Sequence, residues 1–149
     1  MKYLFDSNVV SDIYNISSVN HAVVIKKLLS LKENDEIFVS ILTIYEFEYA
    51  FANSPEHKKV ELQATIQQIQ QIQQDFVVLP LTPSEAKIFG DLKKQFKELR
   101  KAKRETLKKH TLDLMIAASA IGQGIVLVSA DKIYKDIQFL DSELKLDCS

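Results

Sequence analysis

Four acidic residues stand where a predicted strand ends or a predicted helix begins. They are Asp6, Glu46, Asp113 and Asp131. A buried carboxylate is costly unless hydrogen-bond donors or a positive charge accompany it. Carboxylates that converge without basic partners repel one another, and a hard divalent cation that takes oxygen ligands removes this repulsion. The four positions therefore favour a site for Mg²⁺ or Mn²⁺.

Such a site suits chemistry on a phosphodiester. Two ions about 3.5–4 Å apart can activate a water molecule and stabilise the leaving oxygen. The segment just before Asp113 is strongly basic, since residues 93–109 contain nine Lys or Arg and two Glu, a net of +7, while the rest of the chain carries −8. We predict phosphate contacts from this segment, because its cations attract a polyanion without reading bases. The residues predicted to make them are Arg100, Lys101, Lys103 and Arg104.

Each of the four acids also has a purely structural explanation at a helix start. Asp6 or Ser7 would cap a helix that begins at Asn8. Thr43 and Glu46 have the T-x-x-E spacing of a capping box. Asp113 would face the positive end of a helix capped by Thr111, and Asp131 would cap a short helix near Lys132. A solvated helix face is likewise the alternative for the basic segment.

The elements that must position these side chains alternate along the chain. Short apolar runs predict strands, and longer stretches with helical spacing predict helices between them. The predicted strands are 3–5, 37–40, 76–79 and 125–129, and the predicted helices are 19–31, 43–52, 56–74, 84–107 and 112–121. This alternation predicts an α/β fold with a mostly parallel central sheet and helices on both faces. The 149 residues, 46% of them hydrophobic, suit one domain over 1–149.

Other classes of site find little support. The one cysteine, Cys148, excludes a disulfide framework or a cysteine-based zinc site within one chain. Charges interrupt every apolar run, so we expect no membrane span, and the apolar run at the N-terminus is too short for a signal peptide. We therefore expect a cytoplasmic protein. Neither a G-x-x-x-x-G-K-[ST] nor a G-x-S-x-G motif occurs. Of the three histidines, His110 is the one near a candidate site residue, since it precedes Asp113 by three residues. We therefore regard His110 as a candidate for contact with a phosphate bound there.

Three segments together resemble the PIN-domain family, and most closely its VapC-type toxins of toxin–antitoxin pairs. YLFDSNVVSDIY is similar to the first family motif, and SILTIYEFEYAFANS to the second. DLMIAASAIGQGIVLVSAD is similar to the third and fourth, in the family's order. The resemblance implies a three-layer PIN-like fold. It assigns the acidic positions to the same four acids, hydroxyl positions to Ser7 and Ser129, where the family more often has Thr, and an amide position to Asn8.

What the resemblance implies is a Mg²⁺- or Mn²⁺-dependent endoribonuclease. It further implies a homodimer and a small antitoxin protein that covers the acidic pocket. A PIN-like module that binds RNA or protein without turnover is the alternative. An aspartate phosphatase is disfavoured, because it needs a second aspartate two residues after the nucleophile, where this chain has Asn8. A phospho-receiver is also disfavoured, because it usually has a clustered acidic pair near its first strand.

Overall fold

Five parallel strands form one sheet in the order β3-β2-β1-β4-β5. They are β1 (Lys2–Phe5), β2 (Glu36–Ser40), β3 (Val77–Leu79), β4 (Val126–Val128) and β5 (Leu146–Asp147). The computed structural model describes residues 1–56, 59–100 and 104–148. In the register of the sheet, Leu4 at the centre lies opposite Phe38 on β2 and Leu127 on β4.

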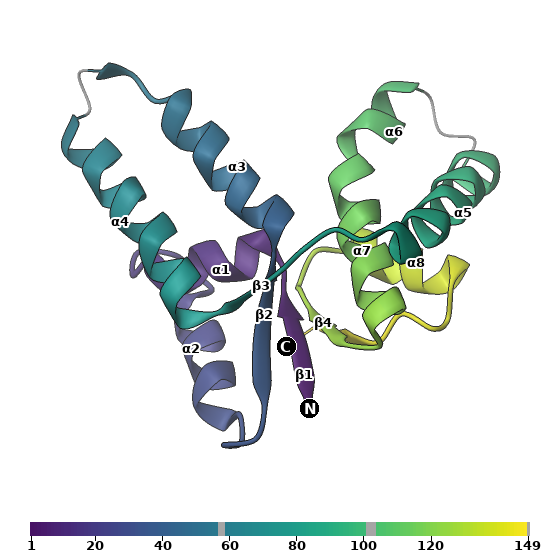
Figure 1. The fold of residues 1–149 in the computed structure, drawn as a ribbon, viewed down its shortest axis with the longest axis horizontal. Helices are drawn as coiled ribbons and strands as arrows, with labels where there is room; N and C mark the ends of the chain where they lie inside the picture. The colour runs from purple at the N-terminus through teal and green to yellow at the C-terminus, as the bar shows by residue number, and fades with distance from the viewer. Residues whose placement is uncertain (57–58, 101–103, 149) are drawn as a thin grey trace.

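Helices cover both faces of this sheet, so the fold has three layers (Figure 1). The helices are α1 (Ser7–Tyr14), α2 (His21–Ser30), α3 (Ile41–Ala52), α4 (Lys59–Asp75), α5 (Pro83–Arg100), α6 (Arg104–Lys109), α7 (Thr111–Gln123) and α8 (Ile133–Leu140). Successive strand side chains point to opposite faces, and β1 shows this clearly. Tyr3 and Phe5 pack in the cluster that contains α1, α2 and α4, whereas Leu4 packs in the cluster that contains α5, α7 and α8.

The sheet has a switch point at β1. The chain leaves β1 toward β2 and β3 on one side, and later returns to place β4 and β5 on the other side. In open parallel sheets, ligands bind beyond the carboxyl ends of the strands at such a point. Figure 1 shows α3 with α4 on one side, and α5 with α6 on the other, extending past this end of the sheet. The segments that follow β1 and β4 therefore occupy the expected place for a functional site.

The α/β architecture predicted from the sequence is confirmed, but two elements differ from the prediction. The strand β5 was not predicted, because its two residues carry no periodic signal. The described residues of the predicted helix 84–107 lie in α5 and α6, and 101–103 lie outside the described residues. The segment after Asp6 forms a complete eight-residue helix, α1, with Val9 and Val10 buried. In the sequence, a helix at this place was considered only as the alternative in which Asp6 or Ser7 is a helix cap.

Two of the helix caps given as alternatives do not form. Helix α3 begins at Ile41, and Ser40 caps it by accepting a hydrogen bond from the Leu42 amide. Thr43 therefore lies inside the helix, and the predicted capping box with Glu46 does not form. Thr111 is already within α7, and its hydroxyl donates to the Leu107 carbonyl instead of capping the helix.

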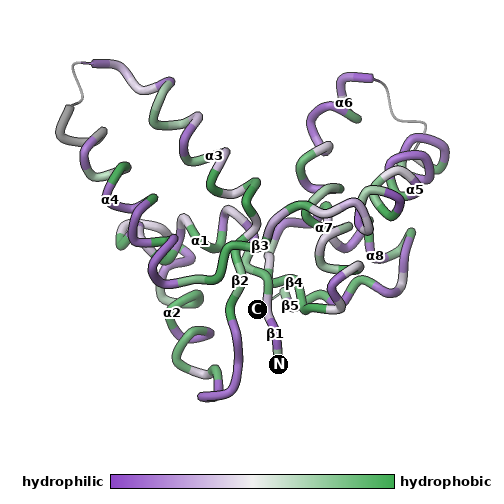
Figure 2. Tube along the Cα trace, in the orientation of Figure 1, coloured by the Kyte–Doolittle hydropathy of each residue, from purple (hydrophilic) through white to green (hydrophobic). Residues whose placement is uncertain are grey.

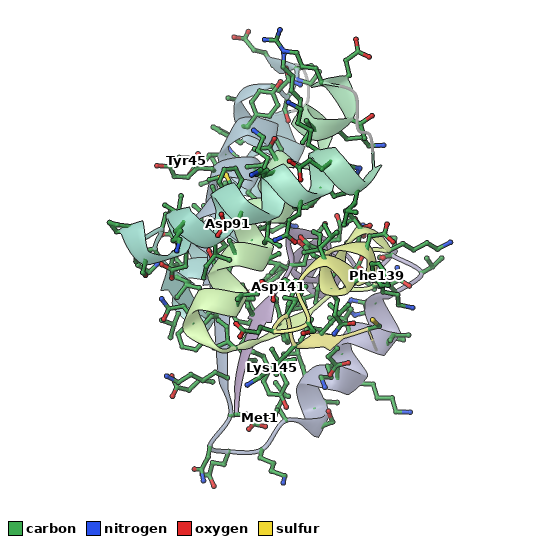
Figure 3. The ribbon with its side chains drawn as sticks, turned by 90° about the vertical axis from the view of Figure 1, so that its right-hand side faces the viewer. Met1, Tyr45, Asp91, Phe139, Asp141 and Lys145 are labelled. Carbon is green, nitrogen blue, oxygen red and sulfur yellow. The ribbon has the colours of Figure 1, made fainter. Side chains whose placement is uncertain are left out.

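The surface carries both polar and isolated apolar side chains. Figure 2 shows hydrophilic residues along the outer parts of α5 and α6, in contrast to the hydrophobic strands at the centre. Tyr45 and Phe139 are exposed and lie toward opposite sides of the molecule in Figure 3. Within the described ranges, no helix has the length and apolar character needed to cross a membrane.

Candidate metal and catalytic site

Asp6 is the most deeply buried of the four acids. It follows β1, and its backbone amide donates to the Val128 carbonyl at 3.1 Å, which ties the ends of β1 and β4 together. Its side chain is only 4% exposed. Although Asp6 stands at the N-cap position of α1, its carboxylate makes no capping hydrogen bond. The cap alternative is therefore not what orients this side chain.

Two hydroxyl groups hold the Asp6 carboxylate. Ser129 Oγ donates to Oδ2 at 3.0 Å, and Tyr134 Oη donates to Oδ1 at 3.1 Å. Burial raises the pKa of Asp6 from 3.8 to about 6; hydrogen bonds from Ser129, the Ser7 backbone and Tyr134 oppose this shift, and the Asp113 charge adds to it. Among the described residues, no Lys or Arg forms an ion pair with Asp6. Within the described ranges, neutral donors alone accompany this buried carboxylate.

Tyr134 connects Asp6 to a second acid. Its side chain is fully buried, and its hydroxyl oxygen lies 3.4 Å from Oδ1 of Asp113 as well as 3.1 Å from Asp6. Burial and the charges of Asp6 and Asp113 raise the pKa of Tyr134 well above its usual value, so the phenol keeps its proton. A phenol has one hydrogen to donate, and the shorter contact indicates that Asp6 is its main acceptor.

Asp113 lies in the first turn of α7, where the helix dipole favours a negative charge. Its second oxygen, Oδ2, lies 3.1 Å from Nδ1 of His110, three residues earlier. The His110 ring in turn packs edge-on against Phe96 of α5, with the ring centroids 5.7 Å apart. His110 thus contacts one oxygen of the Asp113 carboxylate and Tyr134 the other. The short distance between His110 and Asp113 is the one expected from the sequence.

Glu46 is held by a chain of hydroxyl groups. Ser7 Oγ donates to Glu46 Oε1 at 2.8 Å and lies 2.9 Å from Thr43 Oγ1. Since a hydroxyl has only one hydrogen, Ser7 must accept from Thr43 when it donates to Glu46. Thr43 is fully buried one turn before Glu46 on α3, and Ser7 lies between the two side chains.

Asp131 is the most loosely placed of the four. Its side chain is exposed, and Oδ1 accepts at 3.2 Å from the amide of Ile133, the first residue of α8, which is the capping contact given as its structural alternative. Its own amide donates to Ser129 Oγ at 3.1 Å. Ser129 therefore joins Asp131 to Asp6. Asn8 is exposed and borders two recesses, one shared with Glu46 and the other with Asp131.

The four carboxylates are grouped at one end of the sheet, but they do not form a closed cage. In the described part of the chain, no three His, Cys, Asp or Glu side chains are arranged to hold a metal ion. Each carboxylate instead has a hydrogen-bond partner of its own, Ser129 for Asp6 and His110 for Asp113. Asp131 takes a backbone amide and Glu46 takes Ser7. A common metal site for the four acids stays a prediction.

A sequence model of the PIN domain matches residues 3–140. The chain belongs to the PIN-domain family. No protein of curated function matches it.

Solved structures with the same fold include several VapBC proteins, one of them described as a member of the VapBC family of toxin–antitoxin systems. VapBC2 from Rickettsia felis, bound to a promoter DNA fragment, superposes with a TM-score of 0.75 at 18% identity, over 99% of this chain and 98% of that one. VapBC-1 from nontypeable Haemophilus influenzae gives 0.73 at 18%, over 99% and 97%. FitAcB from Neisseria gonorrhoeae gives 0.67 at 20%, over 97% and 95%. At these identities the similarity establishes the PIN fold.

The donor set of this PIN domain fits Mg²⁺ or Mn²⁺. The four carboxylates offer oxygen, which these hard ions prefer over nitrogen or sulfur. The buried Asp6 has hydrogen-bond donors but no positive partner among the described residues. A divalent cation would supply the missing positive charge.

Sequence reasoning missed the role of two residues in this PIN domain. Tyr134 had a detectable signal, because it lies on the buried stripe of α8 with Ile133 and Ile137, and a buried tyrosine needs a partner for its hydroxyl. Thr43 was noted only as a cap. Its actual partner, Ser7, is 36 residues away in sequence, and local spacing does not reveal such a pair.

The predicted phosphate contacts are only partly placed. Arg104 begins α6 and is exposed. Lys101 and Lys103 lie outside the described residues, and for Arg100 only its place at the end of α5 is described. These four residues stay predicted RNA contacts.

Proposed function

We propose that this PIN domain is a divalent-metal-dependent endoribonuclease and the toxin of a type II toxin–antitoxin pair. The observation that carries the proposal is the Asp6 carboxylate, which is buried at the switch point of the sheet without a cationic partner among the described residues and shares Tyr134 with Asp113. Membership of the PIN family supports nuclease chemistry. The similar folds of VapBC proteins, one of them described as a toxin–antitoxin family member, support the toxin assignment.

The chain offers four carboxylates to hold Mg²⁺ or Mn²⁺: Asp6, Glu46, Asp113 and Asp131. A bound ion of this kind activates water and stabilises developing charge on a phosphodiester. Ser129 and Tyr134 orient Asp6, while Ser7 holds Glu46. The predicted cations of the α5–α6 segment would bind the phosphates of the RNA.

Partners belong to the same proposal. A small antitoxin is supported by the similar VapBC structures, one of which is described as a member of the VapBC family of toxin–antitoxin systems. The homodimer implied by the resemblance is tested by light scattering of the purified chain. A mass of one chain, 17.0 kDa, at micromolar concentration would contradict it.

A non-catalytic RNA-binding module is the second candidate. The open arrangement of the acids in the described residues favours it, since no three of them surround one point. The two candidates predict the same binding of RNA but differ in whether the RNA is cut.

Incubation with total cellular RNA, followed by sequencing of new 5′ ends, separates them. We expect cleavage with Mg²⁺ or Mn²⁺ and none with EDTA. Glu46→Gln removes a charge but keeps an acceptor for Ser7, and we expect it to lower kcat/KM by about 10²-fold or more, equivalent to ~2.7 kcal/mol of transition-state stabilisation. Glu48→Gln is the matched control, because Glu48 is exposed two residues further along α3 and points away from Glu46.

The possible results are distinct. Cleavage that is lost with EDTA and in Glu46→Gln, but kept in Glu48→Gln, supports the nuclease. RNA that is bound and left intact with every divalent ion favours the non-catalytic module.

A further inference from the structure

The hydroxyl group of Tyr134 has no role in packing. The ring is fully buried among the apolar side chains of α5, α7 and α8, where phenylalanine would fill nearly the same volume. A buried hydroxyl costs free energy unless it is hydrogen-bonded. Its partners in this structure are the carboxylates of Asp6, after β1, and Asp113, on α7.

This hydroxyl connects two like charges that come from different elements. Asp6 Oδ1 lies at 3.1 Å and Asp113 Oδ1 at 3.4 Å from the same oxygen atom. The remaining oxygens are held elsewhere, Oδ2 of Asp6 by Ser129 and Oδ2 of Asp113 by His110. Each carboxylate therefore contacts two groups, and the Tyr134 hydroxyl, which can donate to one of them at a time, is the group they have in common.

We infer that Tyr134 is a positioning residue for the divalent ion: its hydroxyl sets the orientation of Asp6 and Asp113 before the ion binds. The inference rests on the proposed metal-dependent function and adds to it a residue that binds no ion itself. Each carboxylate oxygen has two lone pairs, so an oxygen that accepts from Tyr134 keeps one for a metal. Groups that orient metal ligands in this way contribute about 10–100-fold in metal affinity.

The chain contains a matched control for the same chemical group. Tyr14 Oη donates to Asp75 Oδ2 at 2.7 Å, and this phenol–carboxylate pair joins α1 to α4 away from the four acids. Tyr14→Phe and Tyr134→Phe thus each remove one phenol hydroxyl that is hydrogen-bonded to carboxylate. Only the second removes it from the proposed site.

Mn²⁺ affinity, measured by electron paramagnetic resonance of the free ion, tests the inference. We expect Tyr134→Phe to weaken Mn²⁺ binding by about 10–100-fold, and Tyr14→Phe to leave it unchanged. Wild-type or tighter affinity in Tyr134→Phe would overturn the positioning role while leaving the metal site intact. Failure of the wild-type protein to bind Mn²⁺ would instead overturn the metal site itself, and the positioning role with it.

A second measurement on the wild-type chain does not depend on the folding of the variant. In protein labelled with ¹³C at the tyrosine ζ carbon, we expect saturating Mg²⁺ to shift the Tyr134 resonance, because its acceptors become metal ligands. The Tyr14 resonance should stay in place. An unmoved Tyr134 resonance in Mg²⁺-saturated protein would refute the inference.

Discussion

Asp6→Asn should stabilise the metal-free protein in a pH-dependent way. Because burial raises the pKa of Asp6 from 3.8 to about 6, the folded state holds a proton between these pH values that the unfolded state has lost. The free energy of unfolding of the wild-type protein therefore falls as the pH rises through this window. This loss of stability is the cost of burying the ionised Asp6 carboxylate. The penalty is absent below the unfolded pKa and complete above about pH 6, where it reaches about 3 kcal/mol.

Asparagine carries no charge at any of these pH values, so the variant escapes this penalty. It loses hydrogen-bond strength to Ser129 and Tyr134, a cost of about 1 kcal/mol that does not vary across the window. Relative to wild type, Asp6→Asn should thus be equal or slightly less stable near pH 4. Above about pH 6.5 it should be more stable by about 2 kcal/mol, the penalty less the hydrogen-bond cost.

Urea unfolding followed by circular dichroism, in EDTA and at several pH values between about 4 and 8, measures this difference. Asp75→Asn is the control, because that carboxylate is exposed and bonded to Tyr14 outside the site. A difference between Asp6→Asn and wild type that does not change with pH would refute the reasoning. So would a wild-type protein that gains stability relative to the variant as the pH rises.

Two further predictions concern Ser129 and the basic segment. Ser129→Ala leaves Asp6 Oδ2 without its donor and the Asp131 amide without its acceptor; we expect a loss of about 1–3 kcal/mol in the free energy of unfolding, and an unchanged urea midpoint would contradict it. Replacing the four predicted phosphate contacts with glutamine should lower the slope of log affinity for single-stranded RNA against log salt by about 3 in magnitude. A slope that stays the same would favour a solvated helix face. The residues replaced are Arg100, Lys101, Lys103 and Arg104.

The positions of Asp6 and Asp131 after two strands were predictable from the sequence, because they follow from the order of elements. Apolar runs that alternate with helical segments predict a parallel sheet. In such a sheet the carboxyl ends of all strands lie at the same end of the sheet. Asp6 and Asp131 follow two of these runs, and the structure puts the ends of β1 and β4 side by side. The sequence did not reveal that β1 and β4 are neighbours, since pairing depends on packing across the whole sheet.

The detailed contacts were not predictable, because they join residues far apart in sequence. Ser7 meets Glu46 across 39 residues, and Tyr134 meets Asp6 across 128. Local rules also favoured the wrong partner for Glu46: the T-x-x-E spacing predicted a capping box, but α3 begins earlier because Ser40 supplies the cap. Thr43 therefore forms its hydrogen bond with Ser7, a tertiary contact, and not with a neighbour on its own helix.

The most direct test of the central claim is the anomalous scattering from a crystal grown with Mn²⁺. The account predicts a strong peak at ligand distance from the Asp6 carboxylate and from at least one of Asp113, Asp131 and Glu46. A protein saturated with Mn²⁺ that shows no peak beside Asp6, or binds the ion only elsewhere, would contradict the claim that these carboxylates form a metal site.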